Sequence, residues 1–324
     1  MHEGALRVGA EHLNWNRLID RTLRFNRTRL TSKIIGTFVN KSLLELITCP
    51  YCGSTDSHLW AQELGYSAVR CDRCDLIFCN PRPASEQIAA AVRTGAHGDE
   101  AQGLNVAARR VNAKVKHYRA VFGEMFADTW RAGRPISWLD IGAGYGEVME
   151  AVAALAPNGS RILGLEPMRP KADSARARGL AITEDYLRPS HPKVQVISVV
   201  DVFSHIAHFG DFLRDVRSVL EPSGELFIET GNLADLQLRD EFPGELGLPD
   251  HLVFAGEKHL IGYLNEAGFD VLKIHRLRVD GIVNLAKNIV KKLIGRPAAV
   301  RFPYTSHYRQ LQVRARLRPS VEQH

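Results

Sequence analysis

Two pairs of cysteines carry the first chemical signal in the sequence. Cys49 and Cys52 lie in "CPYC", Cys71 and Cys74 lie in "CDRC", and 18 residues separate the two pairs. Each short turn can present two thiolates to one ion, and four thiolates complete the tetrahedral shell that Zn²⁺ prefers. Because four protein ligands leave no position for water, we predict a structural zinc ion that supplies folding energy to a small segment.

Two other interpretations of the cysteines stay open, a redox-active pair and unpaired structural thiols. All five cysteines lie within 31 residues, which favours a metal site over a disulfide framework. We interpret the fifth, Cys79, as a small residue of a strand rather than as another ligand.

A glycine-rich turn is the second signal. In "SWLDIGAGYGEVMEAVAAL", an apolar run leads to Gly142, Gly144 and Gly146, and a helical pattern follows. Such a turn directs backbone N–H groups and a helix dipole at a ligand, and a Cβ would block the close approach. The third glycine of the dinucleotide pattern G-x-G-x-x-G would fall at Glu147, whose charge would repel a pyrophosphate. The spacing therefore favours a ligand without phosphate.

Two acids flank this turn. Asp140 precedes the glycines, and Glu166 ends the next apolar run, "RILGLEP". S-adenosylmethionine (SAM) carries an ammonium group, a sulfonium and a ribose diol. Asp140 can pair with the ammonium group, and a carboxylate at Glu166 can accept hydrogen bonds from the ribose hydroxyls. A tight turn with no ligand is the alternative for the glycines alone.

Alternating strands and helices must position these residues. From Ile136 onward the sequence repeats strand–helix units, which predicts a mainly parallel sheet covered on both faces, with ligands at its carboxyl edge. We expect "NPRP", at 80–83, to stop regular structure. The predicted strands are 136–141, 161–166, 181–183, 195–200, 224–230, 270–278 and 306–316, and the predicted helices are 146–156, 169–178, 210–220 and 257–268.

These stretches resemble the class I SAM-dependent methyltransferases. "LDIGAGYGE" is similar to motif I of that family, and "LGLEP" to its acidic second-strand motif; residues 196–232 and 251–274 resemble later parts of the domain. The resemblance covers 133–317 and implies an α/β, Rossmann-like sheet of seven strands whose last strand is antiparallel. Ser204 stands where the family often has Glu before His205.

The resemblance also implies roles for single residues. Gly142 and Gly144 approach the methionine part of SAM, Asp140 holds its amino group and Glu166 its ribose. Met168 packs on adenine, and Glu184 faces the adenine amino group. Apart from the resemblance, the place of Tyr145 in the glycine turn suggests that it bounds the methyl pocket, with packing on neighbouring loops as the alternative. An ordinary solvated turn is the alternative for Glu184. The predicted cofactor residues are Asp140, Gly142, Gly144, Tyr145, Glu166, Met168 and Glu184.

Histidines after the predicted strands are candidates for a catalytic base. Methyl transfer from a sulfonium needs positioning, but a hydroxyl acceptor also needs a base, and histidine titrates near neutral pH. His205 and His251 are the main candidates, His208 is a weaker one, and Asp201 is expected to line the same pocket. A structural role is the alternative for each.

The expected organisation has four parts and an acceptor that the sequence does not identify. A cysteine-rich module before a methyltransferase domain resembles a bacterial arrangement in which many members act on sugars, some in polysaccharide biosynthesis. A small-molecule or glycosyl acceptor is therefore expected, and the alternatives are an RNA-modifying methyltransferase, an inactive scaffold and, more distantly, an NAD-dependent oxidoreductase. The parts are a helical segment at 1–45, a zinc-ribbon-like module at 46–83, a helical linker or cap at 84–132 and the methyltransferase domain at 133–319.

Charge adds one further expectation. The chain has a net charge of +6, with basic residues concentrated at 17–41 and 287–301. These stretches are either solvated helix faces or contacts with an anionic surface such as a membrane, and the modest charge argues against nucleic acid. With no apolar run long enough to span a bilayer and no signal peptide, a cytoplasmic protein is expected.

Overall fold

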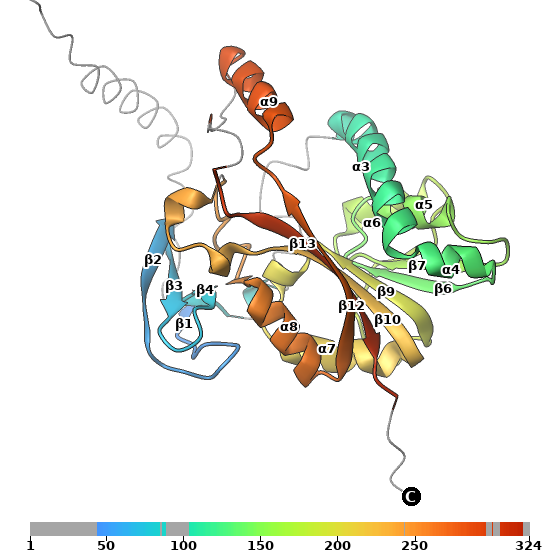
Figure 1. The fold of residues 1–324 in the computed structure, drawn as a ribbon, viewed down its shortest axis with the longest axis horizontal. Coiled ribbons are helices and arrows are strands. Elements are labelled where there is room, and N and C mark those ends of the chain that lie inside the picture. Colours follow the sequence, from blue (N-terminus) through green and yellow to red (C-terminus); the bar gives the residue numbers. More distant parts are fainter. Residues whose placement is uncertain are drawn as a thin grey trace, which may run out of the picture. The chain divides into compact units, whose positions relative to one another are not determined.

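The computed structural model describes residues 44–84, 86–88, 104–242, 244–295, 300 and 305–319 (Figure 1). The predicted helical segment at 1–45 lies almost wholly outside these residues, and so does most of the predicted helix that starts at Ser85. The described chain forms a seven-stranded sheet, a four-stranded sheet and a two-stranded ribbon.

The seven-stranded sheet has the order β12–β13–β10–β9–β6–β7–β8. Neighbouring strands from β10 to β8 are parallel, and β13 is antiparallel to both β10 and β12, so β12 runs in the same direction as the others. This topology confirms the predicted fold class. The strands are β6 (Ser137–Ile141), β7 (Arg161–Leu165), β8 (Ile182–Thr183), β9 (Val194–Val200), β10 (Leu220–Gly231), β12 (Phe269–Arg278) and β13 (Arg309–Leu317).

Helices cover both faces of this sheet because each has one apolar side. In α7, residues Phe209, Leu213, Val216 and Val219 recur at helical spacing and are all buried. They join one core with α8, and a second core on the opposite face joins α3, α5 and an aromatic group around Trp138. The helices are α3 (Leu104–Met125), α4 (Ala127–Ala132), α5 (Glu147–Ala153), α6 (Arg169–Arg176), α7 (Phe209–Val219), α8 (Glu257–Glu266) and α9 (Ile282–Leu293), with short 3-10 turns η3 (Phe203–His205), η4 (Leu233–Asp235) and η5 (Arg239–Glu241).

The four-stranded sheet carries the cysteine turns. It consists of β2 (Ser57–Glu63), β3 (Tyr66–Cys71), β4 (Ile77–Cys79) and β11 (Val253–Phe254), in the order β11–β4–β3–β2. Three strands come from the predicted zinc module, but β11 comes from the region between β10 and α8 and pairs with β4 through Val253 and Phe78. The small sheet is therefore built from two distant parts of the sequence.

The expectation that "NPRP" stops regular structure is wrong. Arg82–Pro83 forms strand β5, which pairs with β1 (Leu44–Glu45) in a two-stranded ribbon. Proline is compatible with a strand that has a neighbour on one side only, because its missing N–H can face away from the partner. Elsewhere, no helix among the described residues combines the length and apolar character needed to cross a membrane.

Candidate functional site

The glycine turn between β6 and α5 approaches the neighbouring loops closely. Gly142, Gly144 and Gly146 have φ angles of 69°, 55° and 84°, in the left-handed region that favours glycine. A Cβ on Gly142 would lie 2.4 Å from Cγ2 of Val202, the second residue after β9. The turn therefore needs glycine both for its backbone conformation and for its fit against the end of β9.

Glu166 fastens this turn to the end of β7. Its side chain is buried, and its Oε2 accepts a hydrogen bond of 2.7 Å from the Gly144 N–H. Its Oε1 accepts another, of 2.8 Å, from the Met168 N–H. Each carboxylate oxygen can accept a second bond, so the group can brace the turn and still receive ribose hydroxyls.

Asp140 lies under the turn at the end of β6. It is 2% exposed, and the Ser198 hydroxyl donates a 2.6 Å hydrogen bond to its Oδ1. Burial raises the pKa of Asp140 to about 8, and the charges of Glu147 and Glu166 add to that rise. A cationic group bound here would favour the ionised carboxylate, which fits the ammonium end of SAM.

The other predicted cofactor residues lie around the same turn. Met168 is the N-cap residue of α6. Tyr145 is half-buried in the turn, and its carbonyl oxygen accepts a hydrogen bond from Arg178. Glu184 follows β8, is exposed, and lies 3.9 Å from Arg169 and 3.8 Å from Arg176. The roles of these three residues at SAM stay predictions.

A histidine–aspartate cluster lies beyond the end of β9. His205 ends η3, and its Nδ1 is 3.0 Å from the Asp250 carbonyl oxygen and 3.2 Å from Asp250 Oδ1. The ring centroids of His205 and His251 are 4.7 Å apart. His251 Nδ1 lies 2.5 Å from the Leu246 carbonyl oxygen, so this nitrogen is the donor. The structure thus brings together the two histidines that the sequence singled out.

Asp201 links this cluster to the sheet. It follows β9 with a φ of 55°, and the Gln310 amide lies 3.4 Å from its Oδ1. Burial of the carboxyl group raises its pKa, while the charges of Lys114, His205 and His251 oppose that rise. A non-glycine residue with positive φ next to a candidate site is the kind of local strain that tight functional loops hold.

His208, at the start of α7, contacts a buried arginine and so has a structural role. Its Nε2 is 3.1 Å from the buried guanidinium of Arg82, and it stands at the N-cap position of α7. Since arginine can only donate, the Nε2 of His208 accepts this hydrogen bond and is occupied.

Sequence reasoning missed a buried carboxyl group beside Asp201. Glu229, on β10, is 1% exposed and accepts hydrogen bonds from Tyr118, Gln310 and Gln312. Burial raises its pKa to about 7, and Asp201 adds to the rise. Its position within a predicted strand, "ELFIETG", gave no signal, because its donors come from α3 and β13.

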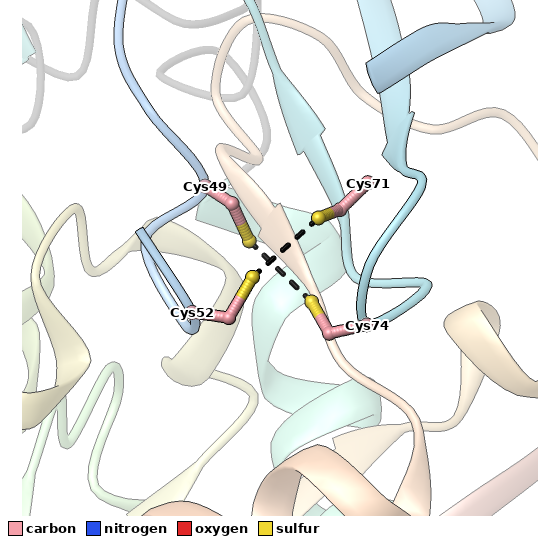
Figure 2. Close-up of side chains that lie close together, drawn as sticks. All are labelled: Cys49, Cys52, Cys71 and Cys74. Atoms are coloured by element: carbon pink, nitrogen blue, oxygen red, sulfur yellow. Dashed lines mark hydrogen bonds between the residues drawn. The ribbon is translucent and has the colours of Figure 1, made fainter. Parts of the chain in front are cut away.

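The four cysteines converge as predicted (Figure 2). Sγ atoms of Cys49 and Cys74 are 3.5 Å apart, those of Cys52 and Cys71 are 3.6 Å apart, and all four cysteines are free. A tetrahedral Zn²⁺ with bonds of about 2.3 Å separates its sulfur ligands by roughly 3.8 Å. The arrangement therefore fits a closed zinc shell with little movement.

Helix α8 supports the cysteine turns from outside. His259, on α8, is completely buried, and its Nε2 donates a 2.8 Å hydrogen bond to the Cys74 carbonyl oxygen, while its Nδ1 accepts from the Gly256 N–H. Tyr263 donates to the Pro50 carbonyl oxygen at 3.0 Å. The lone histidine His259 was missed because its partner lies 185 residues earlier.

Comparison with protein families identifies a methyltransferase domain. The family profile described as "Methyltransferase domain" matches residues 108–274, more than half of the chain. The match spans the glycine turn, Glu166, Asp201 and His251. No curated protein matches the sequence at a significant level.

Solved structures with a related fold include three enzymes. The 1,6-didemethyltoxoflavin-N1-methyltransferase of Burkholderia thailandensis is 16% identical, with a TM-score of 0.46 over 81% of this chain and 99% of that chain. The magnesium protoporphyrin IX methyltransferase of Synechocystis PCC 6803 is 12% identical, with a TM-score of 0.40 over 63% and 79%. The [4+2]-cyclase SpnF is 17% identical, with a TM-score of 0.43 over 57% and 76%. Similarities at this level carry no argument about the substrate.

Proposed function

The chain belongs to the methyltransferase domain family and is a SAM-dependent methyltransferase, and from this premise we propose that it methylates a hydroxyl group of a small polar acceptor. The observation that carries the proposal is the His205–Asp250 pair beyond β9, because an amine acceptor would need no base and a hydroxyl does. Asp201 directly follows β9, four residues before His205.

Asp140, Glu166 and the glycine turn are the proposed SAM-binding residues. Bound SAM supplies an electrophilic methyl group on a sulfonium. Asp140 in its ionised form pairs with the ammonium group, and Glu166 accepts from the ribose hydroxyls while it holds the Gly144 N–H. Met168 and Glu184 are proposed to contact the adenine, and Tyr145 to bound the methyl pocket. These residues fix and desolvate the cofactor, which accounts for much of the rate in a displacement of this kind.

His205 is proposed to remove the acceptor proton. Its Nδ1 donates to the carbonyl and carboxylate oxygens of Asp250, which fixes the tautomer and leaves the Nε2 lone pair available for the acceptor hydroxyl. Asp250 also stabilises the imidazolium that forms. His251 is proposed to line the pocket as a neutral ring. Burial and the neighbouring His205 lower its pKa, which favours the uncharged imidazole.

The acceptor is proposed to be a polyol such as a sugar or a glycan intermediate rather than a nucleic acid. Asp201 and the two histidines offer acceptors and amphoteric groups for hydroxyls, whereas a carboxylate at Asp201 would repel a phosphate backbone. A link to polysaccharide biosynthesis stays a prediction.

We also propose that Cys49, Cys52, Cys71 and Cys74 bind one structural zinc ion and that the domain boundaries follow the sequence prediction, with β11 added to the zinc module. The metal would fix the two cysteine turns, on which His259 and Tyr263 of α8 rest. No chemical step is assigned to it.

The test combines SAM binding with methyl transfer. Calorimetry is expected to show SAM binding, and mass spectrometry of a panel of sugar nucleotides and free polyols is expected to show a gain of one methyl group on oxygen. His205→Gln should abolish transfer but leave SAM affinity within threefold, and Asp250→Asn should reduce turnover with SAM affinity likewise retained. His58→Gln, in the exposed His58–Asp72 pair, is the matched control. Full activity of His205→Gln, or methylation of nitrogen only, would contradict the proposal.

A further inference from the structure

Helix α9 separates its apolar and basic residues over its whole length. Its sequence "IVNLAKNIVKKL" places Ile282, Ala286, Ile289 and Leu293 in one row at spacings of three and four, with Val283 and Val290 beside that row. Lys287 and Lys291 lie on the opposite side, and Lys292 lies at the edge of the apolar half. The apolar side is therefore about half of the helix surface and is bordered by lysines.

The apolar side of α9 is exposed in the described structure. Leu293 is 81% exposed, Val283 71% and Ile282 61%, and Val290 is 57% exposed. In Figure 1, α9 projects from the end of β12, away from the strands of the large sheet. Side chains that contribute this much apolar area to one surface usually belong to an interaction site.

The positive charge around α9 indicates which kind of surface binds its apolar side. Residues 281–305 contain no Asp or Glu, and they include Lys287, Lys291, Lys292, Arg296 and Arg301. A second copy of α9 would bring its own lysines against these, and the basic N-terminal stretch at 17–41 would do the same. An anionic surface with an apolar interior satisfies both halves of the helix, since lysines at the border can extend their ammonium groups to headgroups.

The position of α9 relates it to the site. β12 runs parallel to β9 and β10, and its last residue, Arg278, lies at the same edge of the sheet as the residues that follow β9. Only Val279, Asp280 and Gly281 separate β12 from α9. A surface that binds α9 therefore lies on the side of the domain from which the acceptor approaches.

We propose that α9 binds the surface of an anionic lipid bilayer, with its apolar side in the headgroup–acyl boundary and its lysines at the headgroups. The proposal is independent of the chemistry assigned to His205.

Vesicle sedimentation of the full chain tests this proposal. Phosphatidylglycerol–phosphatidylcholine vesicles are compared with phosphatidylcholine vesicles, with and without added salt. The protein should sediment with the anionic vesicles, and salt should weaken the binding. Replacing three lysines should weaken partitioning roughly a hundredfold, at about a fivefold loss per lysine. The variants are Lys287→Gln/Lys291→Gln/Lys292→Gln and Val290→Ser/Leu293→Ser, and the matched controls are Lys116→Gln/Lys171→Gln/Lys193→Gln and Leu238→Ser/Leu272→Ser.

Each outcome decides the question. All α9 substitutions are at exposed positions, so the variants should unfold at the wild-type temperature, which a thermal scan checks. Loss of binding in both α9 variants but in neither control supports the proposal. Failure of the wild-type protein to bind, or binding that the α9 variants retain, overturns it. A concentration-dependent dimer that Val290→Ser/Leu293→Ser dissociates, without vesicle binding, would assign the face to a second copy instead.

Discussion

Replacement of Glu166 should damage the SAM site in a way that can be divided into two measurable parts. The carboxylate accepts two short hydrogen bonds, from the N–H groups of Gly144 and Met168, at a position that is 6% exposed. Hydrogen bonds to a charged group contribute about 1.5–3 kcal/mol each. Glu166→Ala leaves two N–H groups without their acceptor, so we expect the free energy of unfolding to fall by about 3 kcal/mol or more.

The second part is the affinity for SAM. If the carboxylate also accepts from the ribose, the loss of one such bond weakens binding by about 1.5–3 kcal/mol, roughly ten- to a hundredfold. Glu166→Gln keeps one oxygen for a backbone N–H but turns an amide toward the other donor, so its dissociation constant should lie between those of the wild type and Glu166→Ala. Glu124→Ala, at an exposed position, should change neither quantity measurably.

Calorimetry with SAM and urea unfolding, performed on all four proteins, separate the two parts. A Glu166→Ala protein that remains folded and binds SAM within twofold of the wild type would refute the assignment of this carboxylate to the ribose. A loss of stability without a loss of affinity would leave Glu166 with a bracing role only.

Three further perturbations follow from the site. The pKa of Asp140 is raised to about 8, so its carboxyl group adds to the free energy of unfolding of the unliganded protein below about pH 4, and this contribution is lost as the pH rises toward 8. Asp140→Asn should remove this pH dependence from denaturation curves. SAM binding near pH 7 should release protons, which calorimetry in different buffers measures. Gly142→Ala places a Cβ 2.4 Å from Val202 and should weaken SAM binding about tenfold, whereas Val202→Ala added to it should restore part of the affinity, and no rescue would contradict the steric argument. Elemental analysis should find one zinc per chain, and Cys71→Ser or a strong chelator should lower the melting temperature; a stable protein without metal would argue against the zinc site.

The large sheet was predictable because its elements are local patterns. Apolar runs at 137–141 and 161–165 and the turn at Gly142 are each contained in a short window, and strands in series constrain one another. β10 begins earlier than the predicted strand at 224–230. It starts at Leu220 and passes through an irregular register before Glu225. That irregularity is set by pairing with β9 and not by the local sequence.

The pairings that the sequence could not predict connect distant residues. Asp250 belongs to no recognisable motif. It lies beside His205 because a backbone hydrogen bond, from the Leu252 N–H to the Ser204 carbonyl oxygen, joins the two loops. The donors of Glu229 come from α3 and β13. Two-residue strands such as β11 have no periodicity at all. For such features, tertiary packing decides the environment and a single sequence contains no trace of it.

The pairing of β11 with β4 connects the strands that carry the cysteine turns to the proposed acceptor site. Two residues separate His251 from Phe254, the end of the strand that borders β4, so disorder in the small sheet would spread directly to the proposed catalytic loop. A chimera that imported a foreign cysteine module at 44–83 would leave β11 facing an unrelated edge. Oxidation of the cysteines, or removal of the proposed zinc ion, should therefore reduce turnover under conditions in which the Rossmann-like sheet is still folded.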